Sequence, residues 1–244
     1  MAQTWHDLLF AHWPIDPAVL RPLVPPQLPL DLFQGRCWIG VVPFRMSNIH
    51  ARYLPPIPGL SAFPELNVRT YVTLENKPGV YFFSLDAANL LAVWAARAFY
   101  HLPYFHADMS CKSENDSIIY SSSRRRETAN FRGRYRPTKQ VELALPGTLE
   151  HWLTERYCLY TNVGSEVFRA EVHHSPWPLQ AAEAQIEINT VAKAAGLPDF
   201  DRQPLLHFSR KLEVIIWPLR RVAETVPITA AASTAGPELI TEPT

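Results

Sequence analysis

Four polar side chains alternate along one short stretch of the sequence, Glu65-Leu66-Asn67-Val68-Arg69-Thr70-Tyr71. Successive side chains of an extended strand point to opposite faces, so the carboxylate, amide, guanidinium and phenol of this stretch are expected to share one face. Such a set can hold an anion and move a proton. A polar strand face is either solvated or lines a polar cavity, and the pattern alone leaves both alternatives open.

A second group follows an apolar stretch that ends at Leu102-Pro103-Tyr104-Phe105-His106. We expect Glu65 to act as acid or base and Tyr104 to donate a hydrogen bond, which makes these two the catalytic candidates. The substrate-binding candidates are the side chains that could hold an anionic or carbonyl ligand beside them: Asn67, Arg69, Arg97 and His106.

Arg97 is the one formal charge within the apolar stretch that precedes Pro103. Burying an unpaired guanidinium is costly, so Arg97 is expected to meet either a carboxylate, for which Glu65 and Asp86 are candidates, or another acceptor outside the helix. The alternative is that its side chain reaches water at the end of a helix.

A third group is a cluster of arginines: Arg124, Arg125, Arg126, Arg132, Arg134 and Arg136. The last three share one face of a predicted strand, and a hairpin is expected to place Arg124 and Arg126 beside them. Three interpretations stay open. The cluster is a solvated edge that discourages pairing with other chains, a site for a small anion, or a surface for single-stranded nucleic acid with Tyr135 nearby.

Composition excludes several classes of protein. The chain has 244 residues and a formal net charge of zero, so no global field favours nucleic acid or an anionic membrane. Its hydrophobic residues make up 47%, which excludes wholesale disorder. The sequence contains no Walker loop, no Gly-x-Gly-x-x-Gly, no Gly-x-Ser-x-Gly and no His-Glu-x-x-His, so we expect no cofactor.

No metal site is expected either. The three cysteines, Cys37, Cys111 and Cys158, are far apart, which favours neither a disulfide framework nor a Cys-x-x-Cys site. His173 and His174 are adjacent in a predicted strand, so their side chains are expected on opposite faces and not at one metal ion.

Two features of the sequence lead us to expect a cytoplasmic location. The N-terminus lacks a basic segment typical of a secretory signal, and the longest helical apolar stretch, residues 90–99, is too short to span a bilayer. We therefore expect no membrane partner. The sequence does not decide between a monomer and a homo-oligomer.

The elements that must position these groups are mostly strands. We predict them at residues 8–13, 37–44, 67–74, 80–85, 104–112, 117–125, 130–136, 157–162, 167–174 and 206–217. Lys77-Pro78-Gly79 is predicted to be a hairpin turn, and Asp16-Pro17 to begin a helical turn.

Two longer helices are predicted. One covers residues 87–101, with Asp86 as its N-cap and with so few polar positions that it should be largely buried, and the other runs from Leu149 to about Arg156. Residues 181–195 fit either helix or strand, residues 53–64 form a loop, and residues 225–244 are expected to be a disordered tail. These elements predict a single α+β domain over residues 1–224, mainly antiparallel β, with a curled sheet or closed barrel that one buried helix plugs or caps.

Several ordered motifs resemble the YqjF-like family of uncharacterised bacterial proteins. They are Phe10-Ala11-His12-Trp13-Pro14, Trp38-Ile39-Gly40-Val41-Val42-Pro43-Phe44, Glu65-Leu66-Asn67-Val68-Arg69-Thr70-Tyr71-Val72, Phe83-Ser84-Leu85-Asp86-Ala87 and Leu102-Pro103-Tyr104-Phe105. The resemblance extends over roughly residues 5–222 and implies the closed, mainly antiparallel barrel of acetoacetate decarboxylase.

The resemblance does not carry over the decarboxylase chemistry. That enzyme has two lysines after a Phe-Pro pair, one of which forms a Schiff base, whereas this chain has Tyr104 and Phe105 after Leu102-Pro103. What the resemblance implies is a cavity for a small anionic or carbonyl compound, and lyase or hydrolase chemistry stays open. The alternative is a non-enzymatic module whose arginine-rich hairpin, residues 124–136, binds an acidic partner or nucleic acid.

Overall fold

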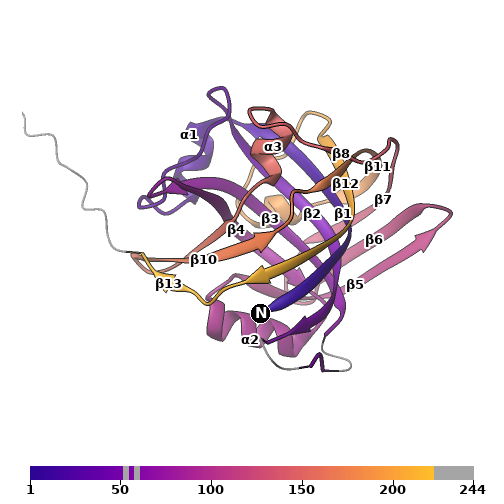
Figure 1. Cartoon of the computed structure of the whole chain (residues 1–244), viewed down its shortest axis with the longest axis horizontal. Coiled ribbons are helices and arrows are strands. Elements are labelled where there is room, and N and C mark those ends of the chain that lie inside the picture. Colours follow the sequence, from indigo (N-terminus) through magenta and orange to yellow (C-terminus); the bar gives the residue numbers. More distant parts are fainter. Residues whose placement is uncertain (52–54, 58–60, 223–244) are drawn as a thin grey trace, which may run out of the picture.

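A single mixed sheet of 13 strands dominates the computed structural model, which describes residues 1–51, 55–57 and 61–222 (Figure 1). The strands are β1 (Ala2–Ile15), β2 (Cys37–His50), β3 (Phe63–Leu74), β4 (Lys77–Ala87), β5 (Tyr104–Glu114), β6 (Ser117–Arg124), β7 (Asn130–Pro137), β8 (Glu142–Leu143), β9 (Cys158–Val163), β10 (Glu166–His174), β11 (Pro178–Asn189), β12 (Leu205–Ile216) and β13 (Arg220–Arg221). The helices are α1 (Pro17–Leu20), the 3₁₀ turn η1 (Arg21–Leu23), α2 (Leu90–Tyr100), α3 (Leu149–Thr154) and α4 (Val191–Ala194).

The sheet closes on itself twice in the described part of the chain. Strands β12, β1, β2, β3 and β4 pair in that order, and β9 and β10 join β4 back to β12. We call this closed circuit the pocket ring. On the other side β5, β6, β7 and β11 also join β4 back to β12, forming what we call the packed ring. The expected closed, mainly antiparallel barrel is confirmed, with parallel pairing at β4–β5 and β4–β9.

The two faces of the shared strands belong to two different cores. On β1, Leu8 and Phe10 pack with residues of β9, β10 and β12, whereas Leu9 and Ala11 pack with residues of β6 and β7. This division follows from the two-residue period of a strand, because neighbouring side chains must enter opposite rings. Both cores are well buried, so β1 and β2 are apolar on both faces over much of their length, whereas β3 carries Glu65, Asn67 and Arg69 on the face that enters the pocket ring.

A β-bulge in β1 changes which side chains enter the pocket ring. Asp7 has a φ of 54°, and the register of β1 against β2 shifts between His6 and Ala11. The extra residue places Trp5 and Leu8 on the same side, although one has an odd and the other an even number. Arg45 and the backbone of the neighbouring strands hold the bulge, since Arg45 Nε donates to the Asp7 carboxylate at 2.9 Å.

The hairpin between β3 and β4 turns two residues earlier than predicted. Glu75 and Asn76 both have positive φ, 53° and 58°, as a tight two-residue hairpin requires. Lys77 and Pro78 already belong to β4. Gly79 is needed for a different reason, because a Cβ at this position would lie 2.6 Å from the Cys158 carbonyl oxygen of the adjacent strand.

The prediction that residues 87–101 form a largely buried helix is wrong. The helix α2 begins at Leu90, and Asn89 is its N-cap, with its side-chain oxygen accepting from Ala92 N at 3.1 Å. Its outer face carries Leu91 and Trp94, which are 61% and 66% exposed, while Val93 is buried. An apolar sequence shows that both faces of a helix could be buried. It does not show that other segments of the same chain pack against both faces.

Other predicted elements agree with the structure, with longer bounds at several ends. Asp16 caps α1 and Thr148 caps α3. The ambiguous residues 181–195 are mostly strand, in β11, followed by the short helix α4. Parts of the predicted loop at 53–64 and all of the tail at 225–244 lie outside the described residues. In the described ranges no helix exceeds the 11 residues of α2, so none is long enough to cross a membrane.

Candidate functional site

The pocket ring encloses a small cavity of about 80 Å³. It is lined mainly by apolar side chains of β1, β2, β4, β9 and β10, with a few polar groups among them. The lining residues that have a nitrogen or oxygen atom in the side chain are Gln3, Trp5, Glu65, Asn67, Arg69, Tyr104, Thr154, Arg156, His174 and Trp177. Four of the sequence candidates therefore meet in one place, Glu65, Asn67 and Arg69 from β3 and Tyr104 from β5.

Glu65 and Tyr104 form a buried pair. The Tyr104 hydroxyl donates to Glu65 Oε2 at 2.6 Å, and Glu65 is only 4% exposed. Burial raises the pKa of Glu65 to about 8; the hydrogen bond from Tyr104 opposes this rise and the charge of Asp86 adds to it. Burial, together with the Glu65 charge, also raises the pKa of Tyr104 well above its ordinary value. A pKa of about 8 favours the protonated form of Glu65 at neutral pH, with Oε2 accepting the hydrogen bond from Tyr104.

Arg69 is held by packing alone. It is 8% exposed, and its guanidinium carbon lies 5.4 Å from the centre of the Phe10 ring and 5.7 Å from that of Tyr71. Its Nε has no hydrogen-bond partner within the part of the chain that the structure describes, and neither has Asn67 Oδ1. A buried guanidinium without a carboxylate partner is costly to keep, and its charge suits an anionic group.

Arg156 brings a second guanidinium to the same place. Its Nη1 donates to Asp31, its Nε donates to the Trp152 carbonyl at 2.6 Å, and its guanidinium carbon lies 5.0 Å from the Tyr71 ring. Its Nη2 has no partner among the described residues. Burial lowers the pKa of Arg156, which the Asp31 carboxylate counteracts and the charge of Arg69 reinforces. Two buried guanidinium groups thus lie near the Tyr71 ring, at 5.7 and 5.0 Å from its centre, and one of them, that of Arg156, is paired with the Asp31 carboxylate.

Hydrogen-bonding atoms without partners are concentrated in this cavity. Five of the twelve such buried side-chain atoms in the described residues belong to its lining: Trp5 Nε1, Asn67 Oδ1, Arg69 Nε, Arg156 Nη2 and Trp177 Nε1. Four of the five are N–H donors. Native proteins pair nearly all buried polar atoms, so a cluster of unpaired donors needs an explanation, and an acceptor-rich ligand supplies one.

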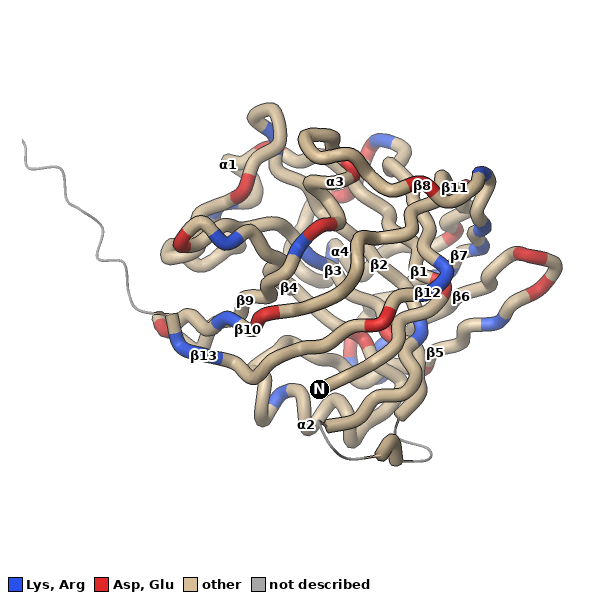
Figure 2. The backbone as a smooth tube through the Cα atoms, viewed as in Figure 1, with Lys and Arg blue, Asp and Glu red and all other residues tan. Residues whose placement is uncertain are grey.

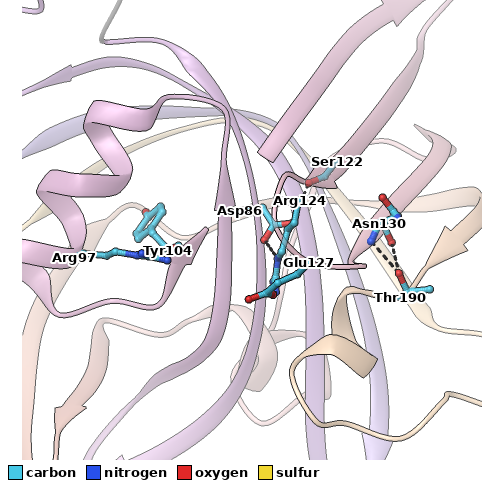
Figure 3. Close-up of polar contacts among 8 residues, drawn as sticks. All are labelled: Asp86, Arg97, Tyr104, Ser122, Arg124, Glu127, Asn130 and Thr190. Carbon is cyan, nitrogen blue, oxygen red and sulfur yellow. Dashed lines mark hydrogen bonds and ion pairs between the residues drawn. The ribbon is translucent and has the colours of Figure 1, made fainter. Parts of the chain in front are cut away.

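Two substrate-binding candidates are not among the residues that line the cavity. Arg97 is exposed on α2, and its Nε donates to the Tyr104 carbonyl at 2.6 Å rather than to Glu65 or Asp86 (Figure 3). Arg97 thus meets an acceptor outside the helix, one of the expected partners, and its side chain is also exposed near the end of α2. His106 is half-buried on β5, beyond the cavity.

Asp86 is neither a helix cap nor a partner of Arg97. It ends β4 as a buried carboxylate that accepts from Arg124 Nε at 2.6 Å and from the Ser122 hydroxyl at 2.9 Å (Figure 3). Arg124 also meets Glu127, at 3.0 Å. Arg124 is therefore part of a buried ion pair between β4 and β6, and the prediction that it lies beside the other arginines of the cluster is wrong.

The three exposed arginines of β7 are matched by acidic residues of other strands of the sheet. Arg132 lies 3.8 Å from Glu187, Arg134 lies 3.7 Å from Glu114, and Arg136 pairs with Glu183. Figure 2 shows blue and red segments interspersed around this part of the sheet. The hairpin has less uncompensated positive charge than its sequence implies, so we assign no function to it.

Sequence reasoning missed Arg156, Trp5 and Trp177. Arg156 follows α3 and resembles the charged end of a surface helix, and only the closure of β4 against β9 turns it inward. Trp5 faces the cavity because of the bulge at Asp7. No lysine lines the cavity, and no three His, Cys, Asp or Glu side chains gather to hold a metal, in the portions of the chain described above.

Comparison with known proteins places this geometry in a family. The model of the family DUF2071, described as an uncharacterized conserved protein, matches residues 2–213. The uncharacterized protein YqjF of Bacillus subtilis (strain 168) is 52% identical over 222 residues, which cover 91% of this chain and 92% of the relative.

Solved structures show the same fold at low identity. The acetoacetate decarboxylase of Legionella pneumophila superposes with a TM-score of 0.64 at 11% identity, covering 92% of this chain and 88% of that one. The enduracididine biosynthesis enzyme MppR complexed with pyruvate gives a TM-score of 0.64 at 10% identity, covering 91% and 90%. The chain therefore belongs to the DUF2071 family of YqjF-like proteins and has an acetoacetate-decarboxylase-like fold.

Proposed function

We propose that this protein binds a small monocarboxylate that also has a carbonyl group, and that Glu65 exchanges a proton with the bound molecule. The observation that carries the proposal is the set of unpaired donors around Arg69 and Arg156. Among the described residues Asp31 pairs with Arg156 and no carboxylate pairs with Arg69, so one further negative charge would balance the two guanidinium groups. A carboxylate accepts from both arginines at once, as a bidentate anion does.

The rest of the cavity limits the size and the second group of the ligand. A volume of about 80 Å³ is far below that of a pocket for a drug-sized molecule and admits only a few non-hydrogen atoms. The protonated Glu65 offers an O–H donor, which suits a carbonyl oxygen rather than a second carboxylate. The pyruvate complex of MppR, which shares the fold, supports a ligand of this size.

The acid–base part rests on the pKa of Glu65, which lies near neutrality. A group with a pKa of about 8 can give and take a proton at neutral pH, as general acid–base catalysis requires. Schiff-base chemistry is not part of the proposal, because the lining of the cavity in the described residues includes no lysine.

Binding is tested with pyruvate as the probe, by isothermal titration calorimetry and by the shift in Tm. Wild type is expected to be stabilised, whereas Arg69→Met should lose the stabilisation. Arg134→Met removes an exposed arginine by the same change and is the control that keeps it. Failure of pyruvate, acetate and 2-oxobutyrate to bind, or equal binding by Arg69→Met, contradicts the proposal.

Proton transfer is tested by following the methyl protons of pyruvate in heavy water by NMR. The Glu65 O–H donates to the carbonyl oxygen while water removes a methyl proton, and the reverse steps return deuterium to carbon. Wild type should therefore speed the exchange, and Glu65→Gln should remove that rate. Binding without faster exchange would mean that the chain only binds its ligand, which contradicts the acid–base part. Affinity should also weaken as the pH rises through about 8, because Glu65 then adds a negative charge beside the bound carboxylate.

A further inference from the structure

His12, Gly40 and Arg69 form one row across three strands. In the antiparallel ladder His12 of β1 stands opposite Gly40 of β2, and Gly40 stands opposite Arg69 of β3. Directly opposed residues of a ladder have neighbouring side chains on the same face. Because the middle residue has no side chain, the outer two can approach each other over it.

Gly40 is needed for space and not for an unusual backbone. Its φ lies outside the left-handed region, but a Cβ here would lie 3.2 Å from His12 Cδ2 and 3.3 Å from Arg69 Cγ. Contacts this short force a neighbour to move by a few tenths of an ångström. The imidazole and the stem of the arginine therefore already occupy the room that a methyl group would take.

Tyr71 completes the arrangement from the same strand as Arg69. Its hydroxyl lies 2.7 Å from His12 Nε2, and both residues are fully buried. The tyrosine ring in turn lies against both guanidinium groups of the site, 5.7 Å from Arg69 and 5.0 Å from Arg156. On the other side of Arg69, the Phe10 ring is stacked on His12 at 5.9 Å with an interplanar angle of 8°.

Arg69 itself makes no hydrogen bond among the described residues that would fix its direction. Its orientation is set by the two rings and by the His12 contact over Gly40. His12 does not line the cavity, so it acts on a ligand only through its neighbours. Burial and the charge of Arg69 keep the pKa of His12 well below its ordinary value, so the ring is neutral beside the cation.

We infer that His12, Gly40 and Tyr71 are positioning residues that hold the Arg69 guanidinium at the angle required for anion binding. The inference rests on the proposed function, in which Arg69 receives a carboxylate. Three of the motifs that distinguish the sequence, around residues 10–14, 38–44 and 65–72, thereby meet at one side chain. The row fixes the direction in which the Arg69 guanidinium points, whereas the positive charge of Arg69 does not depend on the row.

The first experiment measures pyruvate affinity by calorimetry in Tyr71→Phe and Gly40→Ala. Tyr71→Phe should weaken binding about fivefold, because an Arg69 guanidinium that is no longer held in place must be ordered when the anion binds, and Gly40→Ala by at least as much. Tyr135→Phe is the matched control, since it removes an equally buried hydroxyl that donates to the Asp7 carbonyl in the packed ring. It should lose stability but keep its affinity within about twofold.

The second experiment observes Arg69 without any ligand. Its Nε–Hε resonance is assigned by its loss in Arg69→Lys, and it should shift in Gly40→Ala and Tyr71→Phe but not in Tyr135→Phe. A purely structural role for the row would leave this resonance unmoved. An unmoved resonance, or unchanged pyruvate affinity in both variants, overturns the inference.

The two proposals fail in different ways. If Arg69→Met binds pyruvate as wild type does, the proposed function fails. If Arg69→Met loses binding while Gly40→Ala and Tyr71→Phe retain it, only the positioning role fails. In the Arg69→Met background, Gly40→Ala should cause no further change in pyruvate binding, and an additive loss would show that Gly40 acts elsewhere.

Discussion

Two tyrosines of the packed ring and two arginines of the pocket ring are buried to a similar depth, but their polar atoms have different surroundings. The Tyr120 hydroxyl donates to the carbonyls of Phe44 and Glu65, and the Tyr135 hydroxyl donates to the Asp7 carbonyl. Arg69 and Arg156 each keep an N–H without a partner among the described residues. The two tyrosines thus find acceptors within the chain, whereas each of the two arginines keeps an N–H that the described residues do not pair.

The contrast arises on strands that the two rings share. On β3, Leu66 and Val68 enter the packed ring while Glu65, Asn67 and Arg69 enter the pocket ring. A single strand therefore serves stability on one face and ligand binding on the other. Unpaired buried polar groups lower the free energy of unfolding. A protein is expected to retain such groups where they serve its function.

The largest effect is expected from opening a cavity in the packed ring. Phe131 is 1% exposed and its ring meets that of Tyr120 edge-on at 6.1 Å. Phe131→Ala should lower the free energy of unfolding by about 3–5 kcal/mol, the usual cost of a buried phenylalanine, as measured by urea denaturation. Phe99→Ala on the exposed face of α2 is the control and should change it by less than about 0.5 kcal/mol. Equal losses would mean that α2 is also buried in solution.

The next effect separates the rings by pH. Glu65 has a pKa of about 8 in the folded chain against an ordinary value of 4.5, so between these values the folded state holds a proton that the unfolded state has lost. Wild-type stability should therefore fall as the pH rises from 4.5 to 8 through this group.

Glu65→Gln removes that dependence, so relative to wild type the variant should gain a few kcal/mol of stability over the same pH range. Urea denaturation across that range measures the difference. Glu187→Gln, an exposed position on β11, should give a curve parallel to wild type. Parallel curves for Glu65→Gln as well would mean that Glu65 is not buried as a protonated acid.

The sequence predicted the polar face of β3 because strand alternation is a local property. The two-residue period needs no knowledge of the fold, so Glu65, Asn67 and Arg69 could be grouped before any neighbour was known. The closed barrel followed from the family resemblance rather than from the strand pattern, which fits an open curled sheet equally well.

The remaining site residues depend on closure between distant segments. Arg156 enters the cavity because β9 pairs in parallel with β4. Gly79 permits the close approach of the two strands, although the Pro78-Gly79 pair on its own predicts a turn. Asp86 has the features of an N-cap, but Asn89 takes that role and Asp86 pairs with Arg124 of β6. Whether such a local pattern forms the predicted turn or cap depends on contacts with residues that lie far along the chain.

A smaller effect is expected from deleting one satisfied hydroxyl in the packed ring. Tyr120→Phe keeps the ring and leaves the carbonyls of Phe44 and Glu65 without this donor. The free energy of unfolding should fall by about 1–2 kcal/mol. A value near zero, measured by the same denaturation, would show that water replaces the hydroxyl, and the packed ring would then be less dry than its core indicates.

The smallest effect is expected from the matching deletion in the pocket ring. Asn67 is 4% exposed and its Oδ1 has no partner in the described residues, so Asn67→Leu removes a polar atom that contributes no hydrogen bond. Its free energy of unfolding should stay the same or rise by about 1 kcal/mol at most. A loss as large as that of Tyr120→Phe would mean that ordered water already satisfies Asn67. The unpaired groups of the pocket ring would then be hydrated rather than reserved for a ligand, and the difference between the two rings would lie in their solvent and not in their function.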